Sequence, residues 1–185
     1  MKFFSSCLGI LVFIILAGLI AAALAGVPIP YLSQVLYKEP PKLDRIVSSS
    51  SDSGREQLSK IANSQSLILD ESDFSSILAA GFVSRTPYVK MVKANIYPDQ
   101  IKLLITLGKK NDYYFLTTLT PAGDTGKFNI KNAQIGNLPL PVFIAKWILG
   151  SGGQLDLSNL FKGYGLRVNK MVLSDGEIQM YFNKN

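Results

Sequence analysis

Residues 88–107 read YVKMVKANIYPDQIKLLITL, and the alternation within this stretch decides the fold. Apolar and polar side chains alternate on both sides of residues 98–100, which is the pattern of two strands joined by a tight turn. Further strand patterns follow at residues 112–120 and 127–135, each preceded by a turn that contains glycine. The stretch therefore predicts an antiparallel, twisted sheet built as a meander.

A helix is predicted directly before this sheet. Asp70 can cap its first turn, and Glu71 and Asp73 place favourable negative charge there. The apolar residues that follow recur at helical spacing and form one stripe: Phe74, Ile77, Leu78 and Phe82. Further upstream we expect a short helix after residues 52–53 and a short strand at residues 66–69.

A second helical stretch interrupts the strands at residues 141–149. Pro139 and Pro141 suit an extended entry and a first helical turn, and Lys146 is the only charge of this helix. It is too short to span a bilayer, so it either packs in a groove of the sheet or lines an apolar cavity. The chain closes with a hairpin of residues 164–173 and 177–182 over an Asp-Gly turn.

The N-terminal end is a candidate membrane anchor, since residues 3–37 carry no charge and residues 7–25 could cross a hydrocarbon core of roughly 30 Å as a helix. Ala23-Leu24-Ala25 also fits a signal-peptidase site, so a cleaved secretory signal is the alternative. The predicted anchor residues are Leu8, Ile10, Val12, Phe13, Ile14, Ile15, Leu16, Leu19, Ile20 and Leu24.

These patterns predict an α+β protein in which an N-terminal transmembrane helix precedes one domain with a curved antiparallel β-sheet packed on one or two helices. The expected segments are an anchor or uncleaved signal at 1–30, a tether at 31–53 and an exported domain at 54–185. The positive charge ahead of the anchor favours a cytoplasmic N-terminus and a periplasmic or extracellular domain.

The composition excludes several classes of chemistry. The chain has no histidine, and its single cysteine lies in the predicted anchor, so Ser-His and Cys-His nucleophiles and the usual zinc sites are absent. The net charge of +6 is scattered, without the basic cluster of a nucleic-acid reader. We therefore predict a protein that is not an enzyme, with no catalytic residues, metal site, cofactor or nucleic-acid partner.

Lipid binding needs a cavity lined by apolar side chains with few polar groups. The residues that could line one are Phe74, Leu78, Phe82, Leu138, Leu140, Phe143, Lys146 and Trp147. Lys146 could meet a lipid phosphate, or it could extend along its own stem into water. The alternative for the apolar residues is that they form an ordinary core.

Three motifs resemble the YpmS-like family of membrane-anchored bacterial proteins and, more broadly, exported domains of lipid-tube (TULIP-like) architecture. They are residues 69–78, residues 135–141 (IGNLPLP) and residues 172–178 (VLSDGEI). The resemblance covers roughly residues 66–182. It implies an α+β domain whose long curved sheet wraps a helix and can enclose an acyl chain, and it implies no catalysis.

The resulting hypothesis is a membrane-anchored, non-catalytic exported domain that binds a lipid or other apolar ligand in the cell envelope. Its partners would be the bilayer and the lipid ligand. The alternative is a structural or accessory subunit that caps a larger membrane complex on its outer side. In that case the small residues of the anchor, such as Ala17, Gly18 and Ala21, would allow partner helices to approach closely.

Overall fold

The computed structural model describes residues 15, 18, 19, 22, 41–61, 65–83, 88–108, 112–149, 155–161 and 166–184. Of the predicted anchor residues, only Ile15 and Leu19 are described, both in helical conformation. No helix within the described part of the chain is both long and apolar enough to cross a membrane. The anchor prediction thus lies almost entirely outside the described residues.

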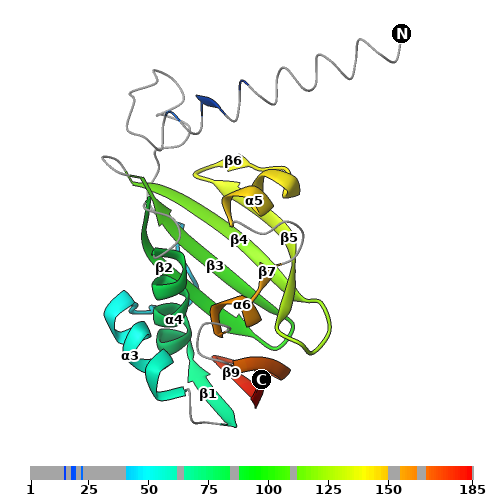
Figure 1. Ribbon diagram of the computed structural model, residues 1–185. Helices are drawn as coiled ribbons and strands as arrows, with labels where there is room; N and C mark the ends of the chain where they lie inside the picture. The colour runs from blue at the N-terminus through cyan, green and yellow to red at the C-terminus, as the bar shows by residue number, and fades with distance from the viewer. Residues whose placement is uncertain are drawn as a thin grey trace.

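The described residues from 41 onward form an α+β fold with two antiparallel sheets (Figure 1). The larger sheet is a curved meander, as the alternating pattern predicts, and two short strands add to it by pairing with β5. Its strands are β2 (Val89–Tyr97), β3 (Gln100–Leu107), β4 (Tyr113–Pro121), β5 (Lys127–Ile135), β6 (Leu138–Pro139) and β7 (Leu155–Asp156). The α+β class and the curved antiparallel sheet are therefore confirmed.

One face of this sheet is apolar apart from Thr117, and its residues pair in register from strand to strand. Three cross-strand rows make up this inner face: Ala94, Leu103, Thr117 and Ala133; Ile96, Ile101, Leu119 and Ile130; and Val92, Ile105, Phe115 and Ile135. All of these side chains are buried. A register shift between β4 and β5 adds to the bend of the sheet.

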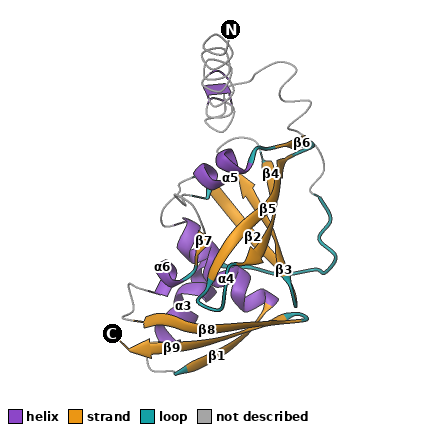
Figure 2. Ribbon diagram, turned by 90° about the vertical axis from the view of Figure 1, so that its right-hand side faces the viewer, coloured by secondary structure: helices purple, strands orange, loops and turns teal. Residues whose placement is uncertain are grey.

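Helices cover the inner face (Figure 2). Helices α4 (Glu71–Val83) and α5 (Val142–Ile148) pack on it, while α3 (Ser51–Ile61) and α6 (Ser158–Phe161) have their main contacts elsewhere. Helix α4 starts as expected, because the amide of Asp73 donates to Oδ1 of Asp70 at 2.8 Å. It packs on β2, whereas α5 packs on β5 near the other margin of the sheet. Helix α3 packs on α4 instead of on the sheet.

The second sheet has three strands in the order β1 (Ser66–Asp70), β9 (Glu177–Lys184) and β8 (Leu166–Ser174). Figure 2 shows it lying across one end of the large sheet, opposite the end that carries α5. The closing hairpin is confirmed, with Gly176 of its turn at a φ of 81° that favours glycine. The pairing of β1 with β9 makes this a separate sheet, which the sequence analysis did not predict.

Close packing of α3 on α4 depends on Gly54. A Cβ at this position would lie 2.0 Å from the backbone oxygen of Ser76, far inside van der Waals contact. Helix propensity alone would make Gly54→Ala stabilising by about 1 kcal/mol. The contact with Ser76 makes the substitution destabilising instead, because neither backbone can move away without disturbing its helix.

We therefore expect Gly54→Ala to lower the free energy of unfolding by about 3 kcal/mol, an overpacking cost. Thermal unfolding followed by circular dichroism measures it. Ser53→Ala, at the exposed neighbouring position, is the matched control and leaves the midpoint nearly unchanged. A Gly54→Ala midpoint equal to that of the control would contradict the close helix contact.

Candidate functional site

The apolar residues predicted to bind a ligand fall into two groups in the structure. Phe74, Leu78 and Phe82 lie on α4 and are 1%, 1% and 8% exposed, so they are part of the core between this helix and the sheet. Their helical spacing indicated a buried stripe correctly. Their burial matches the ordinary-core alternative, because no open surface remains at these side chains.

The second group surrounds α5, at the other margin of the sheet. Leu140 is buried and Leu138 packs partly against the core, while Phe143 is 56% exposed and Lys146 is half-buried. The side chain of Trp147 lies outside the described residues. Phe143 therefore differs from the other apolar residues of the predicted set whose burial is described, because more than half of its surface is exposed.

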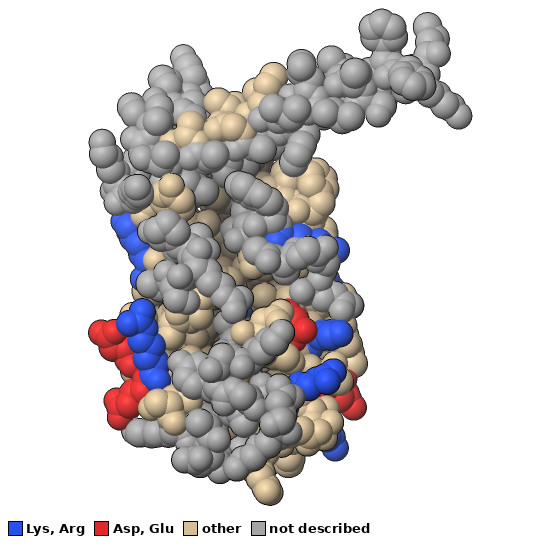
Figure 3. Space-filling model, viewed as in Figure 1, with Lys and Arg blue, Asp and Glu red and all other residues tan. Residues whose placement is uncertain are grey.

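The inner face of β3 and β4 lies between these two groups. Leu103, Ile105 and Phe115 occupy its centre, and each is almost fully buried. In Figure 3, the charged side chains of the described residues lie mainly along the two sides of the molecule.

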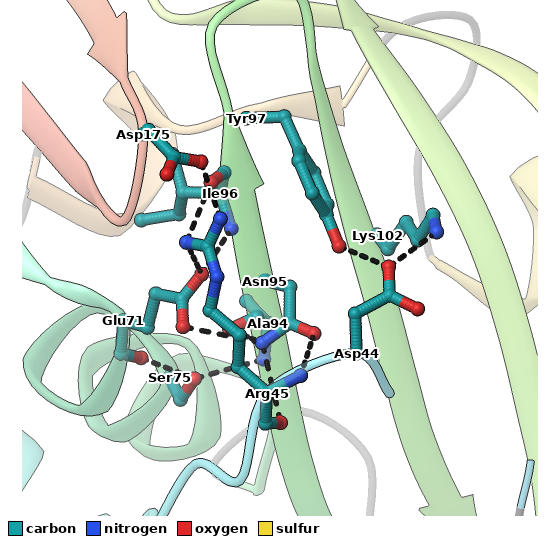
Figure 4. A network of polar contacts seen from close by, with 10 residues as sticks. All are labelled: Asp44, Arg45, Glu71, Ser75, Ala94, Asn95, Ile96, Tyr97, Lys102 and Asp175. Atoms are coloured by element: carbon teal, nitrogen blue, oxygen red, sulfur yellow. Dashed lines mark hydrogen bonds and ion pairs between the residues drawn. The ribbon is translucent and has the colours of Figure 1, made fainter. Parts of the chain in front are cut away.

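The best-defined polar cluster lies at the free edge of β2, where the strand has no neighbour on one side (Figure 4). The amide of Ala94 donates to Oγ of Ser75 at 2.8 Å, and the amide of Ile96 donates to Oε1 of Glu71 at 2.8 Å. The carbonyl of Ile96 accepts from the amide of Gly176 at 3.0 Å. Helix α4 and the β8–β9 turn thus satisfy an edge that would otherwise be open.

Arg45 connects its own segment of the chain to α4, to the β8–β9 turn and to β2. Its Nη1 donates to Oε1 of Glu71 at 2.9 Å and its Nη2 pairs with Asp175. The backbone amide of Arg45 donates to Oδ1 of Asn95, a buried residue of β2, at 3.1 Å. The predicted tether at 31–53 is described from residue 41 onward, and this described part is bound to the domain.

Asp44 adds a second contact of the same segment with the sheet. Its Oδ2 accepts from Nζ of Lys102 at 2.7 Å and from the hydroxyl of Tyr97. The hydrogen bonds from Lys102 and Tyr97 lower the pKa of Asp44, and the bond with Asp44 raises the pKa of Lys102. Partial burial and the nearby carboxylate raise the pKa of Tyr97. The phenol therefore stays protonated and donates its hydrogen bond.

The pKa of Arg45 is raised as well, chiefly by its hydrogen bond with Asp175. Both oxygens of Glu71 already accept hydrogen bonds, from Arg45, Ile96 and Asn95. These bonds hold the carboxylate in place, and together with the Arg45–Asp175 pair they join four chain segments. The cluster therefore has the chemistry of a structural junction.

The sequence pattern around Glu71 indicates only a helix start. Arg45 was missed because it lies in a stretch rich in proline and serine, which resembles a linker. Asn95 offered a usable signal, because it is a polar residue within an otherwise apolar strand segment. Within the described ranges, no three acidic, histidine or cysteine side chains come together in a way that could hold a metal ion.

Comparison with known proteins gives no relative: no family model, curated protein or solved structure matches the chain.

The Glu71 junction gives a direct stability prediction. Glu71→Ala leaves the amide of Ile96 without its acceptor and Arg45 without a partly buried partner, so we expect a loss of about 3 kcal/mol in the free energy of unfolding. Glu71→Gln keeps one acceptor oxygen and should lose less than half of that. Urea unfolding monitored by Trp147 fluorescence measures both.

The matched control is Glu177→Ala, which removes an exposed carboxylate at the start of β9 and should change stability by less than about 0.5 kcal/mol. Equal effects of Glu71→Ala and Glu177→Ala would show that the edge of β2 does not need this carboxylate.

Proposed function

We propose that the protein is a membrane-anchored, non-catalytic domain that binds an acyl chain or similar apolar ligand on the exported side of the membrane. The observation that carries the proposal is the inner face of the large sheet. Apart from Thr117 it is apolar from β2 to β5, and α4 and α5 pack on its opposite margins. The middle strands β3 and β4 offer the ligand its apolar wall.

Helix α5 is the entry in this proposal. It has only seven residues and packs on β5 through Ile144 and Ala145, which are 4% and 0% exposed. Val142 and Phe143, at its start, are 38% and 56% exposed. Displacement of so short a helix exposes less apolar surface than displacement of α4, and its exposed apolar start gives a ligand a first contact.

The resemblance to YpmS-like and TULIP-like domains supports the same function, since those domains combine a long curved sheet with a helix. The uncharged stretch at residues 7–25 supports the membrane anchor and the exported location. In the proposed arrangement, lipid from the bilayer reaches the inner face at α5, and the protein performs no chemistry on it.

The test is native mass spectrometry of the full-length protein extracted from membranes in mild detergent. We expect a bound lipid mass in the wild type and about tenfold less occupancy in Phe143→Ser, because contact with one aromatic ring contributes about 1.5 kcal/mol. Ile68→Ser, which changes a 61% exposed apolar residue on the small sheet, is the matched control and keeps the lipid. A lipid-free wild type would overturn the proposal.

The alternative function, an accessory subunit of a membrane complex, is favoured by a different surface. Ile68, Val172 and Tyr181 are 61%, 38% and 36% exposed and share the outer face of the small sheet, around Gln179. Exposed apolar residues gathered on one face are typical of a protein contact. In that case Ile68→Ser would release a co-purifying protein, whereas Phe143→Ser would not.

A further inference from the structure

A polar hollow of about 390 Å³ is lined by residues of both sheets and of α6. One cross-strand pair from each sheet lines it. Lys127 lies opposite Asp156 in the large sheet, and Arg167 lies opposite Asn183 in the small sheet. The residues next to them in their strands, Phe128, Val168 and Phe182, are buried in the core. The four paired side chains therefore lie on the opposite face of each strand.

The walls of the hollow are fixed. Gly126 approaches Val168 so closely that a Cβ on the glycine would lie 3.2 Å from Cγ1 of the valine, which joins the two sheets at this point. The amide of Leu157 donates to the carbonyl of Gly126 at 2.9 Å. The amide of Ser158 donates to Oδ1 of Asp156 at 2.9 Å and orients that carboxylate.

A register shift in β8 shapes the small-sheet wall. Val168 pairs with Phe182 and Lys170 pairs with Tyr181, so Asn169 between them has no cross-strand partner. The extra residue lies at the hollow and adds a side-chain amide to its lining. Bulges of this kind often redirect a side chain toward a binding site.

The charges in the hollow are unbalanced. Lys127 and Arg167 contribute two positive charges against the single negative charge of Asp156. Among the described residues, neither cation makes a side-chain hydrogen bond or ion pair. Asn169 and Asn183 add amide donors. A guanidinium, an ammonium and amide N–H groups together are the donors that recognise phosphate oxygens.

We infer that this hollow binds a small phosphate ester. Its volume lies at the lower end of the range of ligand pockets, roughly 300–1,000 Å³, which suits a compact anion and leaves no room for a long acyl chain. In this site Arg167 and Lys127 bind the phosphate, and the two asparagine amides and Asp156 bind hydroxyl or amino groups of the ester.

The phosphate ester has two possible sources, a soluble metabolite and the headgroup of a phospholipid. No lining residue of the hollow belongs to α5 or to the inner face of β3 and β4, so the inference does not rest on the proposed acyl-chain site. The two are tested by different variants: Phe143→Ser tests lipid retention at α5, and Arg167→Gln tests anion binding in the hollow.

The experiment is isothermal titration of glycerol 3-phosphate into the full-length protein in neutral phosphatidylcholine nanodiscs at low ionic strength. We expect saturable binding that Arg167→Gln and Lys127→Gln each weaken about tenfold, the effect of losing one charge-assisted contact. Lys131→Gln, an exposed lysine of the same β5 strand outside the hollow, is the matched control and leaves affinity unchanged.

Asp156→Asn should change the affinity for the phosphate ester in the opposite direction. It removes the negative charge but keeps the oxygen that accepts from Ser158, so it should tighten anion binding about threefold. A phosphate-free ligand such as glycerol should give no heat in any variant. No binding of glycerol 3-phosphate, together with no Arg167-dependent binding to phosphatidic acid vesicles, would overturn the inference.

Binding to phosphatidic acid vesicles distinguishes the two sources of the phosphate ester. Binding of phosphatidic acid vesicles that Arg167→Gln abolishes, without binding of glycerol 3-phosphate, assigns the site to lipid headgroups. Binding of the soluble ester alone assigns it to a metabolite. Binding that survives Arg167→Gln and Lys127→Gln unchanged contradicts the hollow as the site in either case.

Discussion

The unpaired edge of β2 is the constraint on which the rest of the structure depends. Its outward amides at Ala94 and Ile96 would be exposed donors if no other element met them. Side chains of α4 meet them, and the Asp-Gly turn of the small sheet meets the carbonyl of Ile96. The hydrogen bonds to this edge therefore fix the positions of α4 and of the second sheet. Arg45 joins the segment that precedes α3 to the same junction.

The hydrogen bonds to β2 hold α4 against one margin of the inner face. Its start is held by the β2 edge, and its apolar stripe of Phe74 and Leu78 is buried. Helix α5 is about half as long as α4, and Phe143 at its start is exposed, while Ile144 and Ala145 are buried. The two helices thus differ in how firmly they cover the same apolar face, and the lighter cover at α5 is why we assign ligand entry to that margin.

Local patterns in the sequence predicted the features that depend on neighbouring residues. The meander, the Asp70 cap and the Asp175-Gly176 turn belong to this group, because period, capping and turn chemistry act over a few positions. The pairing of β1 with β9 joins residues more than a hundred positions apart, and no local signal encodes it. The same reason hid Arg45, whose partners come from α4, β2 and the last turn, and the polar hollow, whose cations come from different sheets.

The most direct test of the central claim is methyl NMR of the full-length protein in nanodiscs that contain a fatty acid with a nitroxide near its chain end. The account predicts paramagnetic broadening of the methyl signals of Leu103, Ile105 and Ile144, because these side chains lie on or against the inner face. The methyl signals of Ile68 and Val172 should stay sharp. Broadening confined to Ile68 and Val172 would contradict the account, because it would place the acyl chain on the outer face of the small sheet.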